Sequence, residues 1–483
     1  MHDVVIVGSG PTGMMLAGEL RLAGADVLVL ERRESQALAG SRGGGFHSRT
    51  IELLDQRGIA DRFLAAGKTL HAATFGSTTL DLSALPTRHP YTLALFQNQI
   101  ERLLLGWIEE LSVPIRRNAE VTGVAADDQG VNVQLASGES VRARYVVGAD
   151  GGRSVVRREA GIELVGPAAT RSSLIAEVQV TEELPEAGKV DQRGIHGLHP
   201  MGDGMVRVVV TEAGLGPTTE PTLQELRREL IAVFGTDFGV HSPTWLSRFT
   251  DATRQATSYR QGRVLLAGDA AHVHSPTGGL GIGLGLQDAV NLGWKLGQVA
   301  RGISGEHLLD TYQSERHPAG ARALKYTMAQ SLFQKADPRL EALRDLLDEV
   351  LVLDGAGTVI AALIAGLDVA YDLGAGHPLL GRRMPDLDVV TPDGPKRVFA
   401  LLHSARPVLL EIGGPGLDTG TWTDRVEHVP AMYDGAWELP VVGKVIAPTA
   451  VLVRPDGHVA WVGEDSADGL TEALAAWCGA ATR

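Results

Sequence analysis

The start of the chain holds the pattern that most restricts its fold. A short β-branched run at residues 3–8 leads into Gly-x-Gly-x-x-Gly at residues 8–13, and apolar residues then recur close to helical spacing. Val27–Leu30 is a second apolar run and is predicted to be a buried strand. A strand, a helix and a strand in this order form a β-α-β unit, which requires a parallel sheet.

The glycine turn of this unit predicts a dinucleotide site. Gly8 would allow the tight turn, Gly10 would let a pyrophosphate approach the backbone, and Gly13 would permit close packing of helix on strand. Free N–H groups at the helix start would face the phosphates. Glu31 follows the second strand, where its carboxylate could bond a ribose hydroxyl pair. The alternatives are an accidental glycine-rich turn and, for Glu31, a solvated strand end.

A second motif, Gly-Ala-Asp-Gly-Gly-Arg-Ser, occupies residues 148–154. It follows a predicted strand and precedes a basic helical start at Val155–Arg158. Taken alone, it is explained equally well by a ligand-binding role or by a plain turn with Ser154 as N-cap.

A third motif begins with the predicted buried strand Arg263–Ala267, which ends at Gly268-Asp269. A glycine-rich turn at 276–285 then opens a predicted helix at 284–300. The Asp269 carboxylate could accept a ligand hydroxyl, and the positive end of the helix could stabilise negative charge on a ligand. His272 and His274 have no further ligand at suitable spacing, so we favour structural roles for them and predict no metal site.

The rest of the chain alternates between two kinds of element. Amphipathic helices are predicted at 49–66 and 97–111, and a long helical stretch at 309–370. Hairpin turns split predicted strands at Val121–Ala126, Val131–Leu135 and Val141–Val147, and an antiparallel block follows at 172–211. A last unit begins near residue 385, with a strand at Val408–Ile412, a hairpin at Val451–Arg454 and His458–Val462, and a closing helix at 468–478.

The composition excludes several classes of protein. The 58 acidic and 44 basic residues give a formal net charge of −14, and the absence of a dense Lys/Arg block argues against a nucleic-acid partner. The single cysteine, Cys478, excludes a disulfide framework and a Cys-x-x-Cys redox centre, and its apolar surroundings favour a buried thiol. The apolar run between Asp354 and Asp368 is shorter than the roughly 20 residues that span a bilayer. No basic n-region precedes the first strand, so the expected protein is cytoplasmic, with no membrane partner.

The three motifs, in this order, resemble the flavin monooxygenases of the para-hydroxybenzoate hydroxylase type, over about residues 1–335. The stretches 236–243, 245–249 and 268–295 are similar to the bacterial branch that hydroxylates aromatic polyketides and includes rifampicin monooxygenase. Relatives in that branch carry a thioredoxin-like C-terminal domain, and residues 385–483 resemble it through Ala447-Pro448-Thr449 before a strand, without the redox cysteine pair.

The resemblance implies an α/β fold with a discontinuous Rossmann-like FAD-binding domain, an inserted antiparallel-sheet substrate domain and a C-terminal thioredoxin-like domain. The expected boundaries are 1–170 plus 262–335 for the FAD-binding domain, 171–261 with 70–96 for the substrate domain, 336–384 for a helical connector and 385–483 for the thioredoxin-like domain.

The resemblance also implies roles for individual residues. Those expected to contact FAD are Gly8, Gly10, Thr12, Gly13, Glu31, Arg32, Arg42, Gln97, Val121, Asp150, Asp269, Gly279, Gly281, Ile282 and Gly283. The nicotinamide cofactor is expected to dock transiently near Asp150, Gly151 and Arg153. Two regions depart from the family pattern. In the flavin turn, Leu280 and Gly283 replace the usual Gln and Asn, and the loop Arg42–Gly45 is richer in glycine than usual. Restoring the amide with Gly283→Asn is therefore expected to tighten FAD binding modestly.

The implied reaction is monooxygenation of a polycyclic aromatic, polyketide-like substrate. NADPH or NADH reduces a non-covalent FAD, O₂ adds to give a flavin C4a-hydroperoxide, and one oxygen atom passes to the substrate. The residues identify no catalytic acid or base; His199, Arg193 and Arg207 are weak candidates for which structural roles are favoured.

Several alternatives stay open at this point. They are Baeyer–Villiger insertion, rifampicin-type antibiotic inactivation, a flavin-binding protein without turnover, and a homo-oligomeric assembly. A flavin-free NAD dehydrogenase is disfavoured because that class lacks the third motif. A hydrolase is disfavoured because no serine lies in Gly-x-Ser-x-Gly.

Overall fold

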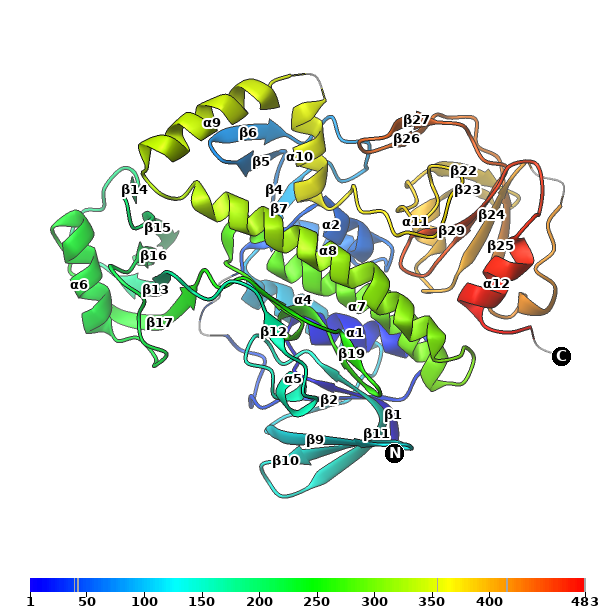
Figure 1. Cartoon of the computed structure of the whole chain (residues 1–483), viewed down its shortest axis with the longest axis horizontal. Helices are drawn as coiled ribbons and strands as arrows, with labels where there is room; N and C mark the ends of the chain where they lie inside the picture. The colour runs from blue at the N-terminus through cyan, green and yellow to red at the C-terminus, as the bar shows by residue number, and fades with distance from the viewer. Residues whose placement is uncertain (39, 41–42, 354, 414–415, 482–483) are drawn as a thin grey trace.

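A computed structural model describes residues 1–38, 40, 43–353, 355–413 and 416–481 of the chain. A sheet covered by long helices forms the centre of the molecule, an antiparallel sheet with α6 lies at one end, and a second mixed sheet with α12 lies at the other (Figure 1). None of the helices in these ranges is long and apolar enough to cross a membrane.

The central sheet confirms the predicted β-α-β unit. Strand β1 (His2–Val7) runs parallel to β2 (Val27–Leu30), and helix α1 (Pro11–Leu22) connects them. The order across the sheet is β19-β20-β11-β1-β2-β8. The strands not yet given are β8 (Ile115–Arg116), β11 (Ser140–Gly148), β19 (Arg260–Gln261) and β20 (Val264–Leu266). Because β11 and β20 run parallel to β1, all three motifs leave the sheet at the same edge.

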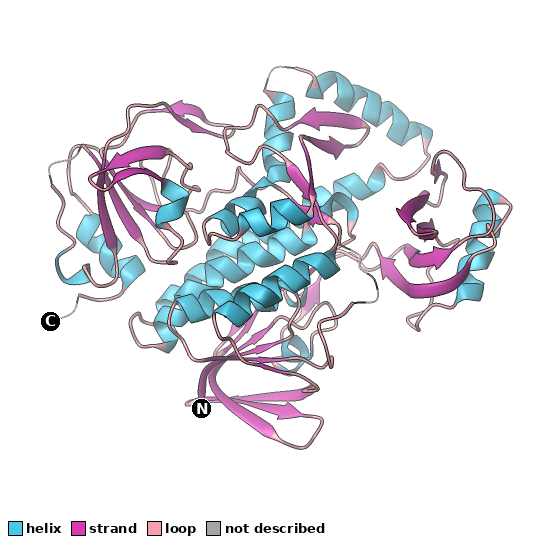
Figure 2. Ribbon diagram, turned by 180° about the vertical axis from the view of Figure 1, so that it is seen from behind, coloured by secondary structure: helices cyan, strands magenta, loops and turns pink. Residues whose placement is uncertain are grey.

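The predicted hairpins extend this sheet. Strands β9 (Val121–Asp127) and β10 (Gly130–Leu135) pair antiparallel with each other, and β10 pairs antiparallel with β11. They project from the lower end of the molecule (Figure 2). The predicted strand boundaries agree with these to within two residues.

Four helices cover the central sheet and pack closely. They are α1, α4 (Gln97–Glu110), α7 (Gly281–Ala300) and α8 (His307–Leu332). Glycine allows the close approach of α1 and α7, because a Cβ at Gly293 would lie 2.3 Å from the Glu19 Cβ. The Trp294 ring of α7 is 1% exposed and belongs to the core that these helices share with the sheet.

The predicted helix at 49–66 is wrong as a single element. The structure has α2 (Ser48–Asp55) and α3 (Ala60–Ala66), separated by a turn in which Gly58 adopts φ +69°. That left-handed backbone ends α2, although the apolar positions of both helices follow one continuous pattern.

The antiparallel block is a sheet of order β14-β15-β16-β13-β17. Helix α6 (Leu223–Phe234) packs on it through Leu226, Leu230 and Val233, and Thr222 with Glu225 forms a capping box at its start. The strands are β13 (Ser172–Gln179), β14 (Lys189–Val190), β15 (Ile195–Gly202), β16 (Met205–Thr211) and β17 (His241–Thr250).

Small sheets connect these bodies. One contains β3 (Gly45–Phe46), β7 (Thr92–Ala94) and β4 (Lys68–Leu70), and a hairpin pairs β5 (Ala72–Phe75) with β6 (Thr78–Asp81). Another contains β12 (Leu164–Val165), β18 (Arg254–Ala256) and β21 (His272–Val273), and the short helix α5 spans Val155–Glu159.

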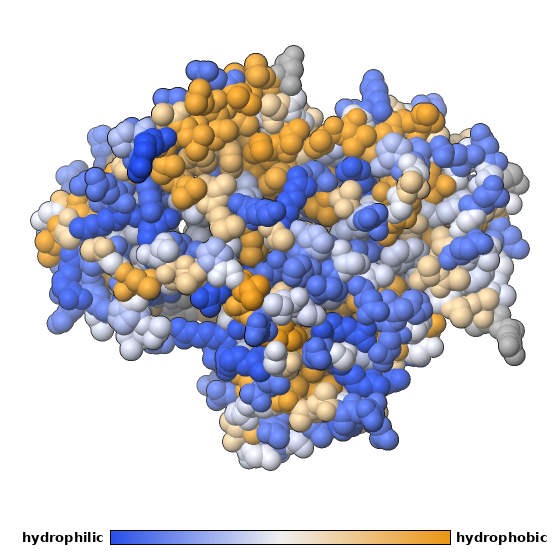
Figure 3. Space-filling model, in the orientation of Figure 1, coloured by the Kyte–Doolittle hydropathy of each residue, from blue (hydrophilic) through white to orange (hydrophobic). Residues whose placement is uncertain are grey.

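Beyond α8, the predicted helical stretch ends earlier than expected. Helices α9 (Pro338–Leu351) and α10 (Ala356–Ala365) are followed by irregular chain from Gly366. Exposed apolar side chains gather on and after α9, and Figure 3 shows an apolar patch over this part of the surface. Its members are Leu343, Leu346, Val350, Val352 and Leu353.

The last unit contains a sheet of order β25-β24-β28-β29. Strand β24 (Val408–Ile412) runs parallel to β25 (Glu427–Ala431) and antiparallel to β28 (Ala450–Val453), which pairs with β29 (Val459–Gly463). Helix α12 (Leu470–Cys478) closes the chain. Cys478 is buried as predicted, and burial raises the pKa of its thiol to about 12.

The other elements of this unit lie around that sheet. They are the hairpins β22 (Asp388–Thr391) with β23 (Gly394–Arg397) and β26 (Trp437–Leu439) with β27 (Gly443–Val445), the helix α11 (Val398–Leu401), and the 3₁₀ turn η3 (Gly420–Trp422).

Candidate functional site

The three motifs meet at the carboxyl edge of the central sheet. A Cβ at Gly13 would lie 2.0 Å from the Gly8 carbonyl oxygen, and a Cβ at Gly8 would lie 2.5 Å from the Ala149 carbonyl oxygen of the second motif. The third motif also approaches, because a Cβ at Gly285 would lie 2.2 Å from the Thr12 Oγ1. These contacts leave no room for a side chain at any of the three glycines.

Gly10 differs from its neighbours because it faces open space. It is the N-cap of α1, no side chain caps the helix there, and a Cβ at Gly10 would have nothing within 4 Å. The start of α1 therefore presents backbone N–H groups and the positive end of the helix dipole to an open face. This is the arrangement that a pyrophosphate requires.

Glu31 is held beside this turn rather than solvated. Its side chain is buried, its Oε2 accepts from the Ser9 N–H at 2.9 Å and the Ser9 hydroxyl at 2.7 Å, and its Oε1 accepts from the Arg33 N–H at 2.8 Å. Burial raises the pKa of Glu31, but the hydrogen bonds from Ser9 and Arg33 outweigh it and lower the pKa to about 2. The solvated strand end considered from the sequence is therefore wrong.

The second motif combines a structural role with a free acceptor. Ser154 does cap α5, since its Oγ accepts from the Arg157 N–H at 2.9 Å. Asp150 Oδ2 accepts from the Val155 N–H at 2.7 Å, whereas Asp150 Oδ1 is buried without a partner in the described part of the chain. A buried acceptor without a donor is costly, so this oxygen is available to a ligand.

The buried Asp288 fixes the start of the third motif through a hydrogen bond with Gly268. Asp269 lies in the 3₁₀ turn η1 (Gly268–Ala270), its side chain is exposed, and no hydrogen bond to it is found among the described residues. Behind it, Asp288 Oδ2 accepts from the Gly268 N–H at 3.1 Å and lies 2.6 Å from His272 Nε2. His272 thus has the structural role that we favoured, and the described residues contain no group of three or more metal-ligating side chains.

The flavin turn lies against the loop Gly43–Gly45. A Cβ at Gly43 would lie 2.4 Å from the Ile282 Cδ1, and the Gln97 N–H donates to the Gly43 carbonyl at 3.3 Å. Gly281 opens α7, whose start has no side-chain cap, and Gly279 adopts φ +67° just before it. Arg42 lies outside the described residues.

The packing around Gly283 conflicts with the gain in FAD affinity expected for Gly283→Asn. A Cβ at Gly283 would lie 2.6 Å from the Thr50 Oγ1, and Thr50 is only 1% exposed. An asparagine there displaces Thr50 before its amide can bond to a ligand. The modest gain in FAD affinity expected for Gly283→Asn therefore requires room that the native α2 does not provide.

A cavity that sequence reasoning missed adjoins this turn. It lies between α2, α7, α8 and α10, and its lining is mostly apolar. The polar groups in the lining are His47, Thr50, Gln287, Arg322 and Asp368, of which the last two form an ion pair. His47 Nε2 lies 2.9 Å from the Gly278 carbonyl oxygen, and burial lowers the pKa of this histidine. In the sequence, His47 closely follows the glycine-rich stretch Gly43–Gly45, and this position could have marked it as a candidate site residue.

The other predicted residues differ in their exposure and partners. Arg32 and Arg153 are exposed, and Val121 is buried at the start of β9. His199 is exposed on β15, and Arg193 lies 3.5 Å from Glu229 in an ion pair.

Of the three candidate catalytic residues, Arg207 lies against Phe96, the neighbour of an expected FAD contact. It lies 2.5 Å from Glu177 in an ion pair, and its guanidinium carbon lies 4.3 Å from the centre of the Phe96 ring. Phe96 is the N-cap of α4 and precedes Gln97.

Comparisons with known proteins agree with this geometry. Residues 1–327 match the family model of the FAD binding domain, and residues 377–481 match the C-terminal domain of aromatic-ring hydroxylases. The chain belongs to the FAD-dependent aromatic-ring hydroxylases and is a flavin-dependent monooxygenase.

Individual relatives and solved structures show which members of this family the chain resembles. A rifampicin monooxygenase of Streptomyces venezuelae is 46% identical over 493 residues, covering 100% of both chains. The structure of OxyS anhydrotetracycline hydroxylase from Streptomyces rimosus is 42% identical, covers 100% of both chains and superposes with a TM-score of 0.91. A dialkyldecalin synthase of Streptomyces rugosporus is 38% identical over 490 residues, again covering 100% of both. The mixed α/β fold is therefore that of the FAD-dependent aromatic hydroxylases.

Proposed function

We propose that the protein inserts one oxygen atom of O₂ into a polycyclic aromatic, polyketide-like substrate, with non-covalent FAD as cofactor and NADPH or NADH as reductant. The observation that carries this proposal is the meeting of three glycine-rich motifs at one sheet edge, next to an apolar cavity. The flavin, when bound, supplies the redox chemistry, taking electrons from the nicotinamide and activating O₂.

The chain's own residues hold the cofactor in this proposal. The open N-terminus of α1 at Gly10 binds the pyrophosphate, and Glu31 and Asp269 accept hydroxyl groups of the sugar and ribityl parts. The buried, unpartnered Asp150 Oδ1 is an acceptor for the flavin or for the nicotinamide cofactor, with Gly151 and Arg153 beside it. The uncapped start of α7 brings positive potential to the negatively charged reduced ring.

The substrate is proposed to reach the flavin turn from the apolar cavity and from the adjacent antiparallel sheet. Apolar walls exclude water and orient an aromatic ring, which is the protein's main task when the cofactor performs the chemistry. Residues 171–261 with 70–96 are proposed as the substrate-binding domain, and Arg207 with Phe96 as its edge nearest to Gln97. Residues 385–483 are proposed as a thioredoxin-like domain without redox function, because the chain has one cysteine.

The decisive experiment combines a binding test and a turnover test. The purified protein is expected to be yellow, and heating is expected to release FAD. NADPH oxidation is expected to rise when polycyclic phenols or quinones are added, and mass spectrometry with isotopically labelled O₂ is expected to find one labelled oxygen in the product. Protein that neither retains nor takes up FAD would refute the assignment.

A matched pair of variants tests the cofactor geometry. Gly10→Ala places its Cβ in open space and is expected to keep the fold while weakening FAD binding. Gly13→Ala places its Cβ against the Gly8 carbonyl and is expected to lower the melting temperature even without FAD. Equal loss of stability in both apo variants would contradict the proposed orientation of Gly10.

A second candidate is that this member of the monooxygenase family uses its bound flavin without redox turnover. It is favoured by the loss of two side-chain amides at Leu280 and Gly283 and by the relative that is named a synthase rather than a monooxygenase. Bound FAD with no substrate-stimulated NADPH or NADH oxidation over the whole panel would favour this reading. A Baeyer–Villiger reaction would instead give an ester or lactone as product.

A further inference from the structure

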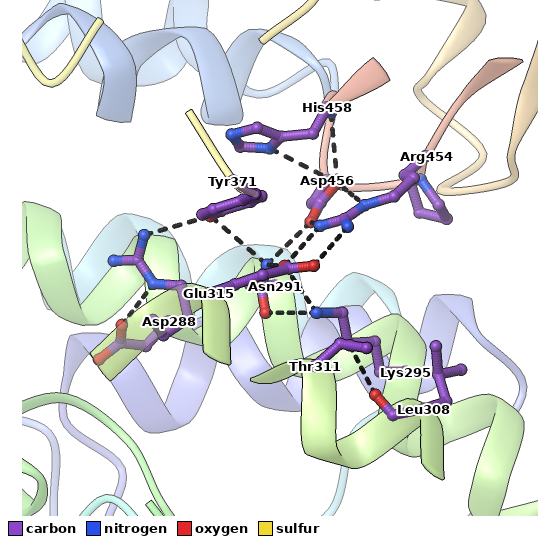
Figure 4. A network of polar contacts seen from close by, with 12 residues as sticks. Asp288, Asn291, Lys295, Leu308, Thr311, Glu315, Tyr371, Arg454, Asp456 and His458 are labelled. Atoms are coloured by element: carbon purple, nitrogen blue, oxygen red, sulfur yellow. Dashed lines mark hydrogen bonds and ion pairs between the residues drawn. The ribbon is translucent and has the colours of Figure 1, made fainter. Parts of the chain in front are cut away.

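The turn between β28 and β29 is inserted between helices of the FAD-binding region. All residues from Arg454 to His458 are buried, although three of them are ionisable. Figure 4 shows this turn reaching α7 and α8, where a network of polar contacts begins. Hairpin turns usually lie at the surface, so the burial of this one needs an explanation.

A pair of charges docks the turn on α8. Arg454 Nη1 donates to Glu315 Oε1 at 2.6 Å and Nη2 donates to Oε2 at 2.8 Å, while Lys295 Nζ on α7 donates to Oε2 at 2.8 Å. Burial raises the pKa of Glu315, but the charges of Arg454 and Lys295 lower it to about 2. The glutamate is therefore ionised and paired with cations from two directions.

A second chain of contacts runs from the turn to the third motif. Asn291 Nδ2 donates to Glu315 Oε2 at 2.7 Å and to Asp456 Oδ2 at 3.0 Å, and it lies 3.4 Å from the Tyr371 hydroxyl. Arg316 Nη1 donates to the same hydroxyl at 3.3 Å, and Arg316 Nε donates to Asp288 Oδ1 at 2.8 Å. The Tyr371 oxygen thus joins the two halves of the chain of contacts.

Asp288 connects this series of hydrogen bonds to the proposed cofactor site. It accepts from the Gly268 N–H, and Gly268 precedes the exposed Asp269 that we assign to FAD. Arg316 and His272 fix both oxygens of Asp288, so the position of the carboxylate depends on the position of Arg316.

The backbone of the turn also holds α2. The Asp456 carbonyl accepts from Arg49 Nη2 at 2.8 Å, and the Pro455 carbonyl accepts from Arg57 Nη2 at 2.7 Å. Arg49 precedes Thr50, which lines the cavity beside the flavin turn. A Cβ at Gly457 would lie 2.5 Å from the Gln56 side chain, so the turn approaches α2 closely.

We propose that the Arg454–His458 turn is a positioning element of the cofactor site, which places Asp269 through Tyr371 and Asp288 and places Thr50 through Arg49. The inference rests on the proposed FAD site. The competing explanation is that the network only attaches the C-terminal unit. Buried ion pairs contribute little net stability compared with apolar packing, and their best-supported use is to fix one arrangement of groups. A line of buried hydrogen bonds that ends at a cofactor motif fits that use.

Tyr371→Phe tests the link with the removal of one oxygen atom. The ring still stacks on His458, and the Arg454–Glu315 pair is intact, so the variant is expected to fold. Tyr145→Phe is the matched control, because it also removes one buried oxygen atom, and the Tyr145 hydroxyl donates to Glu306 at 3.0 Å, outside the network that joins the turn to Asp288. Each protein is titrated with FAD under conditions where its apo form is folded, and the visible spectrum of the bound flavin is recorded.

The expected result is an FAD affinity about two- to ten-fold weaker in Tyr371→Phe, the effect of one lost hydrogen bond, with a shifted flavin spectrum. Tyr145→Phe is expected to lower thermal stability slightly while leaving affinity and spectrum at the wild-type values. Unchanged FAD binding and spectrum in Tyr371→Phe would overturn the proposal and leave attachment as the role of the network. A wild-type protein that binds no FAD in the same titration would refute the proposed function instead.

Discussion

The cofactor edge of the central sheet and the buried Arg454–His458 junction solve opposite packing problems. At the sheet edge, backbone approaches backbone, and Gly8 and Gly13 are needed because any Cβ would collide with a carbonyl. At the junction, charged side chains meet in the interior, and Arg454, Asp456 and Glu315 are each 5% exposed or less. The sheet edge therefore depends on the absence of side chains at its glycines, and the junction depends on each buried charge having its partner.

This difference determines how each region responds to change. Adding one methyl group to the sheet edge produces overlap, whereas removing one charge from the junction leaves its partner buried and unpaired. The junction also spans the chain, since Arg49 and the Asp456 carbonyl are 407 positions apart. Damage to the junction should therefore lower stability by leaving a buried charge unpaired, and a side chain added at Gly8 or Gly13 should lower it by forcing backbone segments apart.

The largest expected effect comes from breaking a buried pair at the junction. Glu19 on α1 pairs with Arg57 at 2.6 and 2.8 Å, both side chains are fully buried, and Arg57 continues to the Leu402 and Pro455 carbonyls of the C-terminal unit. Glu19→Gln is expected to cost about 3–5 kcal/mol of unfolding free energy, because it leaves the arginine without a counter-charge. Urea denaturation measures this cost.

The double variant Glu19→Leu with Arg57→Met serves as the control for that pair. Removing both charges is expected to recover part of the lost stability, since apolar groups of similar size can replace a buried ion pair, although the Leu402 and Pro455 carbonyls lose their donor. A Glu19→Gln protein as stable as wild type would show that solvent reaches the pair and that the contrast between junction and sheet edge is weaker than described.

The contrast also explains what the sequence could predict. The Gly8–Gly13 turn, β1, β2 and β24 were predictable because backbone constraints leave short local patterns of glycine and apolar residues. The break between α2 and α3 was missed because its apolar spacing continues through Gly58. Nothing in local spacing signals that Asp456 contacts Asn291, so the buried turn was read as an ordinary hairpin.

The second largest effect is expected at the sheet edge, where Glu31 has a pKa of about 2 instead of 4.5. Because the folded-state value is depressed, its contribution is fully present above pH 4.5 and is lost as the pH falls toward 2. The full contribution is up to about 3 kcal/mol, with about 1 kcal/mol lost by pH 4 and about 2 kcal/mol lost by pH 3.

Glu31→Gln separates the contribution of the Glu31 charge to the unfolding free energy from the contributions of the other carboxylates. The difference in unfolding free energy between wild type and variant is expected to be largest at pH 7 and to shrink on acidification. A difference that is constant from pH 7 to pH 3.5 would show that the charge of Glu31 is not what holds Ser9 and Arg33.

The third prediction concerns Asp269, a proposed FAD contact that has no hydrogen-bond partner among the described residues. Asp269 is exposed and makes no hydrogen bond within the described residues, so Asp269→Ala is expected to leave the melting temperature of the apo protein unchanged. The loss of a charged hydrogen bond to FAD is expected to weaken binding by about 1.5–3 kcal/mol. Fluorescence titration with FAD measures it, and wild-type affinity in the variant would remove Asp269 from the site.

The candidate site was predictable where it is backbone and unpredictable where it is side chain. Gln97 and Ile282, both expected at the FAD site, lie against Gly43. Thr12 lies against Gly268 and Gly285 of the third motif. The cavity lining was missed because its walls come from four helices that are distant in sequence. Asp288 was also missed, since its role depends on the return of α7 beneath Gly268.

The smallest expected effect lies where the two kinds of packing meet, at Gly283 of the flavin turn and Thr50 of α2. An asparagine amide at 283 could add one neutral hydrogen bond to the ligand, worth about 0.5–1.5 kcal/mol. Its Cβ, however, would lie 2.6 Å from the Thr50 Oγ1, and overpacking costs about 1–3 kcal/mol. Gly283→Asn alone is therefore expected to weaken FAD binding by a few-fold.

Removing the obstacle should reverse the sign. Thr50→Ala deletes the Oγ1 that the new Cβ meets, so Gly283→Asn in a Thr50→Ala background is expected to bind FAD about two- to ten-fold more tightly than Thr50→Ala alone. Isothermal titration of the four proteins completes the cycle and isolates the coupling between the two positions. If Gly283→Asn weakens binding equally in both backgrounds, the obstacle is the backbone of the flavin turn itself, and position 283 belongs with Gly8 and Gly13 among the sites where no side chain is tolerated.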